Sequence, residues 1–348
     1  MMTIPKNMQG VTLTGHGGTE VLKYSANLIV PKPQKNDVLI RVLAAGVNNT
    51  DINTRTAWYS KSDNGVTDAS WSGNALQFPR IQGADVCGVI VAVGEGVSAT
   101  RIGERVIIEP CIQEAHGVKL DTPWYFGSEC DGGFAQYTVV ASRHAYHIKS
   151  GLSDVELASF PCSYSTAENM LTRANVTSKD KVLITGASGG VGSAAVQLAK
   201  ASGAYVIAVT STEKMPLLLT LGADEVISRN DDLIDTFGKN SIDVVVDLVA
   251  GPKWPKLLNV LKPQGRYAVS GAIAGPIVEL DIRTLYLKDL SFFGCTVLGE
   301  QVFKNLVRKI ESNQIKPLVA EIFSLADIGK AQDCFLEKKH VGKIVLKL

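Results

Sequence analysis

The chain has few of the residues that build disulfide frameworks or metal sites, with six cysteines and five histidines among 348 residues. The cysteines are scattered, which is typical of reduced thiols and suggests a cytoplasmic protein. No apolar run approaches about 18 residues, so we expect no membrane-spanning segment. The opening sequence MMTIPKNMQG has no apolar core or cleavage site of the secretory kind. The 35 Lys and Arg residues nearly balance 34 Asp and Glu residues, which argues against a nucleic-acid partner.

The most informative segment that is present covers residues 181–210, KVLITGASGGVGSAAVQLAKASGAYVIAVT. Its pattern predicts a strand over 182–185, a tight glycine turn, a helix over 190–201 and a strand over 205–209, which is a dinucleotide-binding βαβ unit. Gly189 would let the backbone approach a pyrophosphate, and the helix N-terminus would supply N–H groups and partial positive charge. The alternative is a purely structural turn. The expected phosphate-binding residues are Ala187, Ser188, Gly189, Gly190, Val191 and Gly192.

The end of the second strand bears on which dinucleotide is bound. It carries Thr210 and Ser211 and then Lys214, with no acid at the strand end to hold a ribose 2′-hydroxyl. Hydroxyl donors and a positive charge favour a 2′-phosphate and therefore NADPH. Glu213 keeps NADH as a competitor, and Lys214 could instead be a solvated lysine. Further cofactor contacts are expected where later strands end, at Val249, Ser270 and Gly271.

The pattern of elements changes along the chain. Residues 1 to about 155 are β-rich, with a polar, irregular excursion over 61–77, whereas helices and strands alternate from about residue 157. The alternation predicts an α/β fold, a Rossmann-type doubly wound parallel sheet over 156–300. We expect the β-rich, barrel-like substrate domain to comprise 1–155 plus 301–348, because the tail ends in another strand.

Several stretches together resemble the medium-chain dehydrogenase/reductase superfamily. The residues at Asn48 and Asp51 and the loop at 188–192 look most like its quinone oxidoreductase (zeta-crystallin-like) branch. The resemblance implies a GroES-like first domain, NADPH-dependent reduction of quinones or activated enones without zinc, and a dimer or tetramer. The stretches that carry it are AGVNNTD from 45, GADVCG from 83, VAVGEGV from 91, GERV from 103, DGGFAQY from 131, the nucleotide loop, and VGKIV from 341.

The zinc-dependent branch of that family holds its metal with a Cys, a His and a further Cys or Asp. At the corresponding positions this chain has Asn48, Ala84 and Cys162, and one thiol without an imidazole does not make a zinc site. Cys162 is then expected to be a small buried hydrophobe. A structural zinc lobe would need four close cysteines, whereas Cys111, His116 and Cys130 are too few and too far apart. We therefore expect no metal.

Hydride transfer needs proximity, a water-poor site and a donor for the oxygen that gains charge. Asn48 is the candidate donor, near the ribose or the substrate oxygen. Asp51 could orient it or simply cap the following helix. Tyr59 could supply a proton or wall the pocket. These three are the candidate catalytic residues.

Other polar and aromatic residues near these positions have simpler interpretations. Asn53 stands where related reductases often carry an aromatic residue, and Trp58 could compensate for it or form a pocket rim. Arg55 is expected in solvent, although it could meet an anionic substrate group. His144 and His147 are expected at the surface.

Three functions remain open at this point. The leading one is a zinc-independent, NADPH-dependent reductase of quinones or α,β-unsaturated carbonyls. The others are a zinc-type alcohol dehydrogenase and a non-catalytic NADPH-binding protein of the same fold. A homo-oligomer is expected, in which the strand over 290–297 could pair with a second copy.

Overall fold

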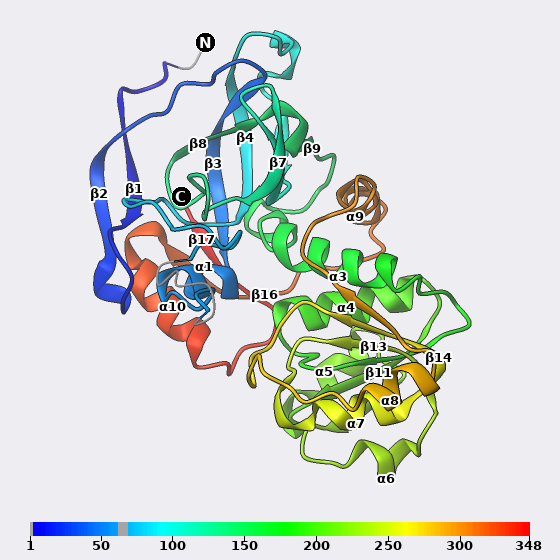
Figure 1. The fold of residues 1–348 in the computed structure, drawn as a ribbon. Helices are drawn as coiled ribbons and strands as arrows, with labels where there is room; N and C mark the ends of the chain where they lie inside the picture. The colour runs from blue at the N-terminus through cyan, green and yellow to red at the C-terminus, as the bar shows by residue number, and fades with distance from the viewer. Residues whose placement is uncertain (1–2, 62–68) are drawn as a thin grey trace. The chain divides into compact units, whose positions relative to one another are not determined.

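The computed structural model describes residues 3–61 and 69–348, so part of the 61–77 excursion lies outside the described residues. The chain forms two compact units: unit 1 is Met1–Cys162 with Pro317–Leu348, and unit 2 is Ser163–Lys316 (Figure 1). Residues 301–316, which the sequence assigned to the β-rich domain, lie in unit 2.

Unit 2 is built on a six-stranded sheet in which every pair of neighbours is parallel. The strand order β12-β11-β10-β13-β14-β15 is that of a dinucleotide-binding Rossmann fold, in which the chain direction across the sheet reverses between β10 and β13. Central strands such as β13 are almost wholly buried, which explains their runs of β-branched residues. The strands are β10 (Lys181–Ile184), β11 (Tyr205–Thr210), β12 (Glu225–Ser228), β13 (Ile242–Asp247), β14 (Leu261–Val269) and β15 (Ser291–Gly294).

Helices cover both faces of this sheet, with α3 and α4 on one face and α7 and α8 on the other (Figure 1). The first of them, α3, was not foreseen from the sequence. The helices of unit 2 are α3 (Pro161–Arg173), α4 (Gly190–Ala201), α5 (Met215–Thr220), α6 (Leu233–Phe237), α7 (Trp254–Val260), α8 (Ile282–Leu287) and α9 (Val302–Glu311).

Unit 1 is the expected β-rich domain. Its main sheet follows the path β16-β17-β3-β4-β5-β9, with β8 also paired to β3, and two hairpins, β1–β2 and β6–β7, complete it. The strands are β1 (Asn7–Leu13), β2 (Leu22–Ile29), β3 (Asp37–Val47), β4 (Asp85–Val93), β5 (Arg105–Ile108), β6 (Cys111–Ala115), β7 (Val118–Tyr125), β8 (Tyr137–Ala141), β9 (Ala145–His147), β16 (Val319–Ser324) and β17 (Lys343–Lys347). The helices are α1 (Asn49–Arg55), α2 (Asp154–Leu157) and α10 (Ile328–Leu336).

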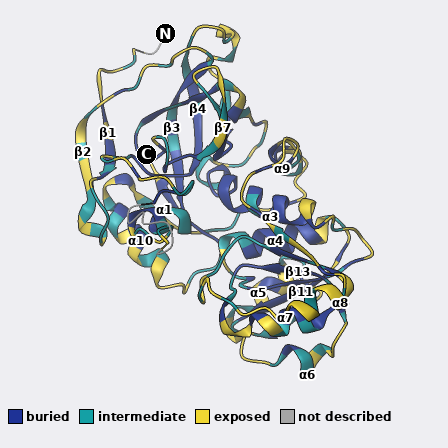
Figure 2. Ribbon diagram, in the orientation of Figure 1, coloured by how far each residue is buried: buried dark blue, intermediate teal, exposed yellow. Residues whose placement is uncertain are grey.

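The core of unit 1 is centred on β3, which is dark blue over most of its length in Figure 2. The C-terminal strand β17 pairs antiparallel with β3, from Ile344 opposite Val47 to Lys347 opposite Ala44. The last residues of the chain therefore form part of the central sheet of a domain that begins at the other end of the sequence. Among the described residues, no helix is both long enough and apolar enough to cross a bilayer.

Two polar residues expected at the surface are buried instead. Arg55 donates from Nε to Gln332 Oε1 at 2.7 Å and from Nη1 to the Gly17 carbonyl at 2.6 Å, which ties α1 to α10. His144 is fully buried, with Nδ1 2.8 Å from Glu109 Oε2, while its Nε2 accepts backbone N–H bonds from residues 113 and 114. The surface interpretation was wrong in both cases because long-range partners satisfy these polar groups.

Candidate active site

The glycine turn between β10 and α4 has the geometry that a phosphate-binding loop needs. Gly186 has a φ of +57°, which favours glycine. A Cβ atom on Gly192 would lie 2.2 Å from the Gly186 carbonyl oxygen, so the close packing of helix on turn requires a glycine there. A Cβ atom on Gly189 would meet only the Gly186 oxygen, at 3.5 Å. Packing therefore explains Gly192 and leaves the small size of Gly189 unexplained unless something approaches its backbone.

Helix α4 begins directly at this turn. Its N-cap is Gly189, and no side chain in the described part of the chain caps it. The first N–H groups of the helix are therefore presented at the turn formed by Ala187 and Ser188, together with the partial positive charge of the helix N-terminus. These features fit the diphosphate of a dinucleotide.

Two basic residues, Lys214 and Arg229, lie near one another and near the acid Glu213 after β11. Desolvation is the main cause that lowers the pKa of Lys214; the nearby Glu213 carboxylate opposes this effect, and repulsion by Arg229 adds to it. The Arg229 N–H donates to the Thr210 carbonyl at 2.7 Å, and the buried Thr210 hydroxyl has no hydrogen-bond partner among the described residues. Arg229 was missed by the sequence reasoning because it follows the next strand, β12, and carries no motif.

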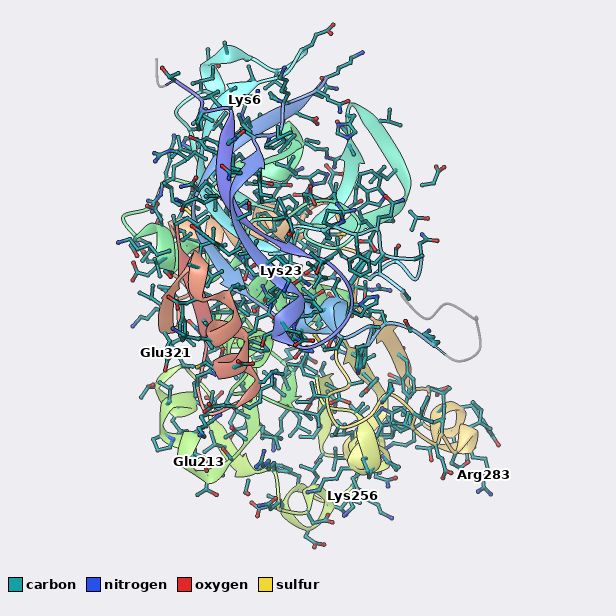
Figure 3. All side chains as sticks on the ribbon, turned by 90° about the vertical axis from the view of Figure 1, so that its left-hand side faces the viewer. Lys6, Lys23, Glu213, Lys256, Arg283 and Glu321 are labelled. Atoms are coloured by element: carbon teal, nitrogen blue, oxygen red, sulfur yellow. The ribbon has the colours of Figure 1, made fainter. Side chains whose placement is uncertain are left out.

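Glu213 is the acid that could favour NADH. It lies on the surface of unit 2 (Figure 3), and a hydrogen bond from Ser211 is the main cause of the lowering of its pKa. The carboxylate is therefore charged at neutral pH and engages the hydroxyl that would otherwise serve a ribose or a 2′-phosphate.

A buried carboxylate, Asp247, organises the next strand end and was also missed. It accepts hydrogen bonds from the Thr185 hydroxyl at 2.5 Å and from the Tyr267 phenol at 2.6 Å. It also accepts the backbone N–H groups of Val249 at 2.9 Å and Ala250 at 3.2 Å. Asp247 thereby fixes Val249, whose side chain lies against Gly186, 3.2 Å from where a Cβ atom would be.

The two remaining cofactor candidates follow β14. The Ser270 N–H donates to the Asp247 carbonyl at 3.3 Å, and a Cβ atom on Gly271 would lie 2.9 Å from the Leu248 carbonyl oxygen. The structure therefore brings the ends of β10, β13 and β14 together at the carboxyl edge of the sheet, where this fold binds its ligands.

In unit 1, Asn48 is part of a buried polar network. Its amide nitrogen donates to Asp85 Oδ2 at 2.9 Å and to the Gly46 carbonyl at 3.3 Å, and its amide oxygen accepts a bond from Lys343 Nζ. Lys343 Nζ also lies 2.7 Å from Asp85 Oδ2, and both side chains are at most 3% exposed. Asp85 and Lys343 both lie in stretches that carried the family resemblance, but nothing in the sequence indicated that they meet.

Asp51 and Asn48 form a capping box at the start of α1, in which the Asp51 carboxylate binds the Asn48 backbone N–H. Its Oδ2 accepts the Asn48 N–H at 2.7 Å, as a cap for α1, and its Oδ1 accepts the Gly83 N–H at 3.2 Å. Burial raises the pKa of Asp51 to about 7, against the lowering effect of the Asn48 bond, and the nearby Asp85 adds to the rise. Asp51 thus joins the start of α1 to the 83–85 segment.

Tyr59 lies beside this network. Its hydroxyl is 2.9 Å from the Thr50 hydroxyl, and burial raises the pKa of Tyr59 to about 12. The phenol is therefore protonated at neutral pH. Trp58, which packs edge-on against Tyr59, is 46% exposed, and Asn53 bonds Asn49.

The positions compared with the zinc ligands come together in the fold. Ala84 packs against Cys162, and the Cys162 N–H donates to Asp85 Oδ1 at 2.5 Å. The Cys162 thiol is 3.0 Å from the Tyr125 hydroxyl, and burial raises its pKa to about 12, which disfavours the thiolate that a metal requires. In the described ranges, no group of three or more His, Cys, Asp and Glu residues could hold a metal ion. His116 bonds Asp37, at 2.9 Å, rather than facing Cys111 and Cys130.

Comparisons with known proteins identify the family. Residues 34–150 match the alcohol dehydrogenase GroES-like domain, and residues 190–312 match the zinc-binding dehydrogenase domain. Over its full length the chain is 31% identical to the full-length quinone oxidoreductase of Lama guanicoe. This chain belongs to the medium-chain dehydrogenase/reductase superfamily.

Other members of the superfamily show the range of activities among its relatives. A chloroplastic NADPH-dependent alkenal/one oxidoreductase of Arabidopsis thaliana is 31% identical over 99% of this chain and 80% of its own. A crystal structure from Sinorhizobium meliloti, assigned provisionally as an alcohol dehydrogenase, has a TM-score of 0.92 and 45% identity over 99% of this chain and 97% of its own. The protein is therefore an oxidoreductase of this superfamily with a nicotinamide cofactor.

Proposed function

We propose that this oxidoreductase is an NADPH-dependent, zinc-independent reductase of quinones or α,β-unsaturated carbonyls. The observation that carries the proposal is the chemistry at the three positions compared with zinc ligands. Asn48 is engaged by Asp85 and Lys343, Ala84 has no donor atom, and the Cys162 thiol is bonded to a phenol. The two relatives named as quinone and alkenal/one oxidoreductases support the same reaction class.

The preference for NADPH rests on unit 2. The uncapped start of α4 and the open space at Gly189 fit a diphosphate. Lys214 and Arg229 lie close enough for their charges to interact, with Glu213 as a nearby acid, and a 2′-phosphate would bring a second negative charge that both cations attract. The unpartnered hydroxyl of Thr210 offers a further hydrogen bond.

When bound, the nicotinamide supplies a hydride to the electrophilic carbon of the acceptor. One proton must then reach the acceptor oxygen of a quinone, or the α-carbon of an enone, to complete the two-electron reduction. Tyr59 carries a proton at neutral pH and is hydrogen-bonded to the Thr50 hydroxyl, so we assign it the donor role. Asn48 can offer its amide N–H to the acceptor oxygen by giving up its longer bond, the one to Gly46 at 3.3 Å, and Asp51 holds its backbone.

The test is the loss of nicotinamide absorbance when the purified protein is mixed with NADPH and 1,4-benzoquinone, or with a panel of enones. The same assay with NADH measures the coenzyme preference, and metal analysis after dialysis measures zinc. We expect turnover with NADPH and substoichiometric zinc. Stoichiometric zinc with alcohol oxidation would instead indicate an alcohol dehydrogenase, and tight NADPH binding without turnover would indicate a binding protein.

We also propose a homo-oligomer that forms through the edge of the unit 2 sheet. β15 is the last strand of that sheet, and exposed apolar side chains occur on it and in the segment that joins β14 to β15. They include Ile273, Ile277, Leu287 and Phe292. Light scattering should show a dimer or tetramer, and replacing Phe292 with Lys should shift it toward the monomer.

A further inference from the structure

An aromatic pair in unit 1 has no part in the reaction described so far. Trp71 stacks on Tyr125, with ring centroids 5.0 Å apart and an angle of 29° between the planes. Tyr125 belongs to a buried cluster with Ala84 and Cys162, and Trp71 packs against that cluster as a partly exposed member. Ala84 and Cys162 stand at two of the three positions where the zinc-dependent branch places donor atoms. Here they belong to an apolar wall, formed with Tyr125, against which the Trp71 indole packs.

The wall is connected to the polar network through the backbone. Ala84 lies between Gly83, whose N–H binds Asp51, and Asp85, whose carboxylate binds Asn48. Tyr125 is fixed at the other end by the bond between its hydroxyl and the Cys162 thiol at 3.0 Å. Burial raises the pKa of Tyr125 well above its usual range, so the phenol is neutral and its ring face is a nonpolar surface.

The backbone of the segment that carries the indole is held in place by hydrogen bonds to residues 128 and 129. Glu129 accepts the Tyr125 N–H through Oε2 at 2.7 Å and the Ser72 N–H through Oε1 at 2.7 Å. The Trp71 N–H donates to the Ser128 hydroxyl oxygen at 3.1 Å. One carboxylate thus clamps the segment that carries the indole to the strand that carries the phenol. A ring fixed in this way loses little entropy when a second flat ring stacks on it.

We infer that Trp71, backed by Tyr125, is the platform on which the flat conjugated ring of a quinone binds, and that Glu129 is the residue that positions it. The inference deepens the proposed function, since it selects ring quinones over acyclic enones at that site. Trp71 would also replace the aromatic residue that is missing at Asn53, because it supplies a stacking surface from a different loop. Trp71 then determines specificity, whereas Glu129 acts through it.

The test compares 1,4-naphthoquinone with the acyclic enone but-3-en-2-one as acceptors. We expect Trp71→Ala to raise the KM for the naphthoquinone about tenfold, the scale of one stacking interaction. The KM for the acyclic enone and the KM for NADPH should change less than about twofold, because no stacking is lost there. Trp71→Phe should retain most of the affinity, and Glu129→Gln should raise the naphthoquinone KM with kcat unchanged. Tyr24→Ala, on an exposed strand of the same unit, is the matched control.

A binding measurement keeps this inference separate from the proposed function. Quenching of tryptophan fluorescence by naphthoquinone without NADPH reports stacking directly, and Trp71→Phe should remove most of it. If the wild type reduces no acceptor but shows this quenching, the proposed function fails and the platform stands. Equal changes in KM for both acceptors, no change for either, or an effect of Trp58→Ala in place of Trp71→Ala would overturn the platform. Thermal melts of each variant identify any that fail to fold; if Trp71→Ala does, the loss of quenching in the folded Trp71→Phe variant decides.

Discussion

Lys343 Nζ lies 2.7 Å from Asp85 Oδ2, and this pair joins the last strand of the chain to β4 in a place that water hardly reaches. The ammonium also binds the amide oxygen of Asn48. A charge pair of this kind is hard to break from one side only, because the remaining charge stays buried without its counterion.

Replacing Lys343 with Met should therefore lower the free energy of unfolding by about 3–5 kcal/mol. The double variant Lys343→Met/Asp85→Asn should be less destabilised than the sum of its single variants, since it removes both charges. Urea unfolding of all three measures the coupling. Lys330→Met is the control. It breaks the exposed ion pair between Lys330 on α10 and Asp327 just before that helix, and it should change the free energy of unfolding little. Additive effects at Lys343 and Asp85 would contradict the buried pair.

Asp51 should give the protein a distinctive dependence on pH. Its pKa is about 7 in the folded state and near 3.8 in the unfolded state, so between these values the folded protein binds the extra proton. The contribution of this group to stability is therefore complete below about pH 4 and is lost as the pH rises through 7. The difference in Tm between the wild type and Asp51→Asn should shrink between pH 5 and pH 8. A difference that stays constant would mean that the carboxyl does not titrate in this range.

Alanine substitutions at two glycines of the nucleotide loop should have different effects, one on thermal stability and the other on NADPH binding. Gly192→Ala places a methyl group 2.2 Å from the Gly186 oxygen and should lower the Tm. Gly189→Ala meets nothing closer than 3.5 Å at a φ of −74°, so its Tm should be unchanged while its affinity for NADPH falls. Calorimetry of binding and thermal melts check both. Normal NADPH affinity in Gly189→Ala would show that the diphosphate does not bind at this turn.

Lys214 after β11 and Arg229 after β12 should determine the preference for NADPH over NADH. Lys214→Ala and Arg229→Ala should each raise the Kd for NADPH about tenfold or more, the scale of one charged hydrogen bond. The Kd for NADH, which has no 2′-phosphate, should stay the same. Lys179→Ala, an exposed lysine of the same unit ahead of β10, should leave both constants unchanged. An unaltered ratio of the two dissociation constants would show that other residues bind the 2′-phosphate.

The sequence predicted the nucleotide-binding half of the molecule in detail. Helix α4 over 190–201 has the bounds expected, and strand β11 over 205–210 is one residue longer than expected, because glycines and buried apolar runs are local signals. The pairing of β14 is interrupted at residues 262–265, where it moves from Leu261 to Arg266 and Gln264 has a φ of +64°.

The interactions that the sequence did not predict are those between residues far apart in the chain. Asn48 meets partners 37 and 295 residues away, and nothing in its neighbourhood shows that its amide group is occupied. Arg55 and His144 looked like surface residues because a charged or polar side chain is buried only when distant segments provide its partners. Asp247 and Glu129 were missed for the same reason. The catalytic assignments of Asn48, Asp51 and Tyr59 remain predictions.

The position of β17 beside β3 also determines the order in which the two units can fold during synthesis on the ribosome. Residues 163–316 are contiguous and can complete their sheet as soon as they emerge, whereas the first domain lacks an interior strand until β17 (Lys343–Lys347) has been synthesised. Before Lys343 is synthesised, the Asp85 carboxylate lacks the ammonium that pairs with it in the folded protein. The barrel that is synthesised first is therefore the one that closes last.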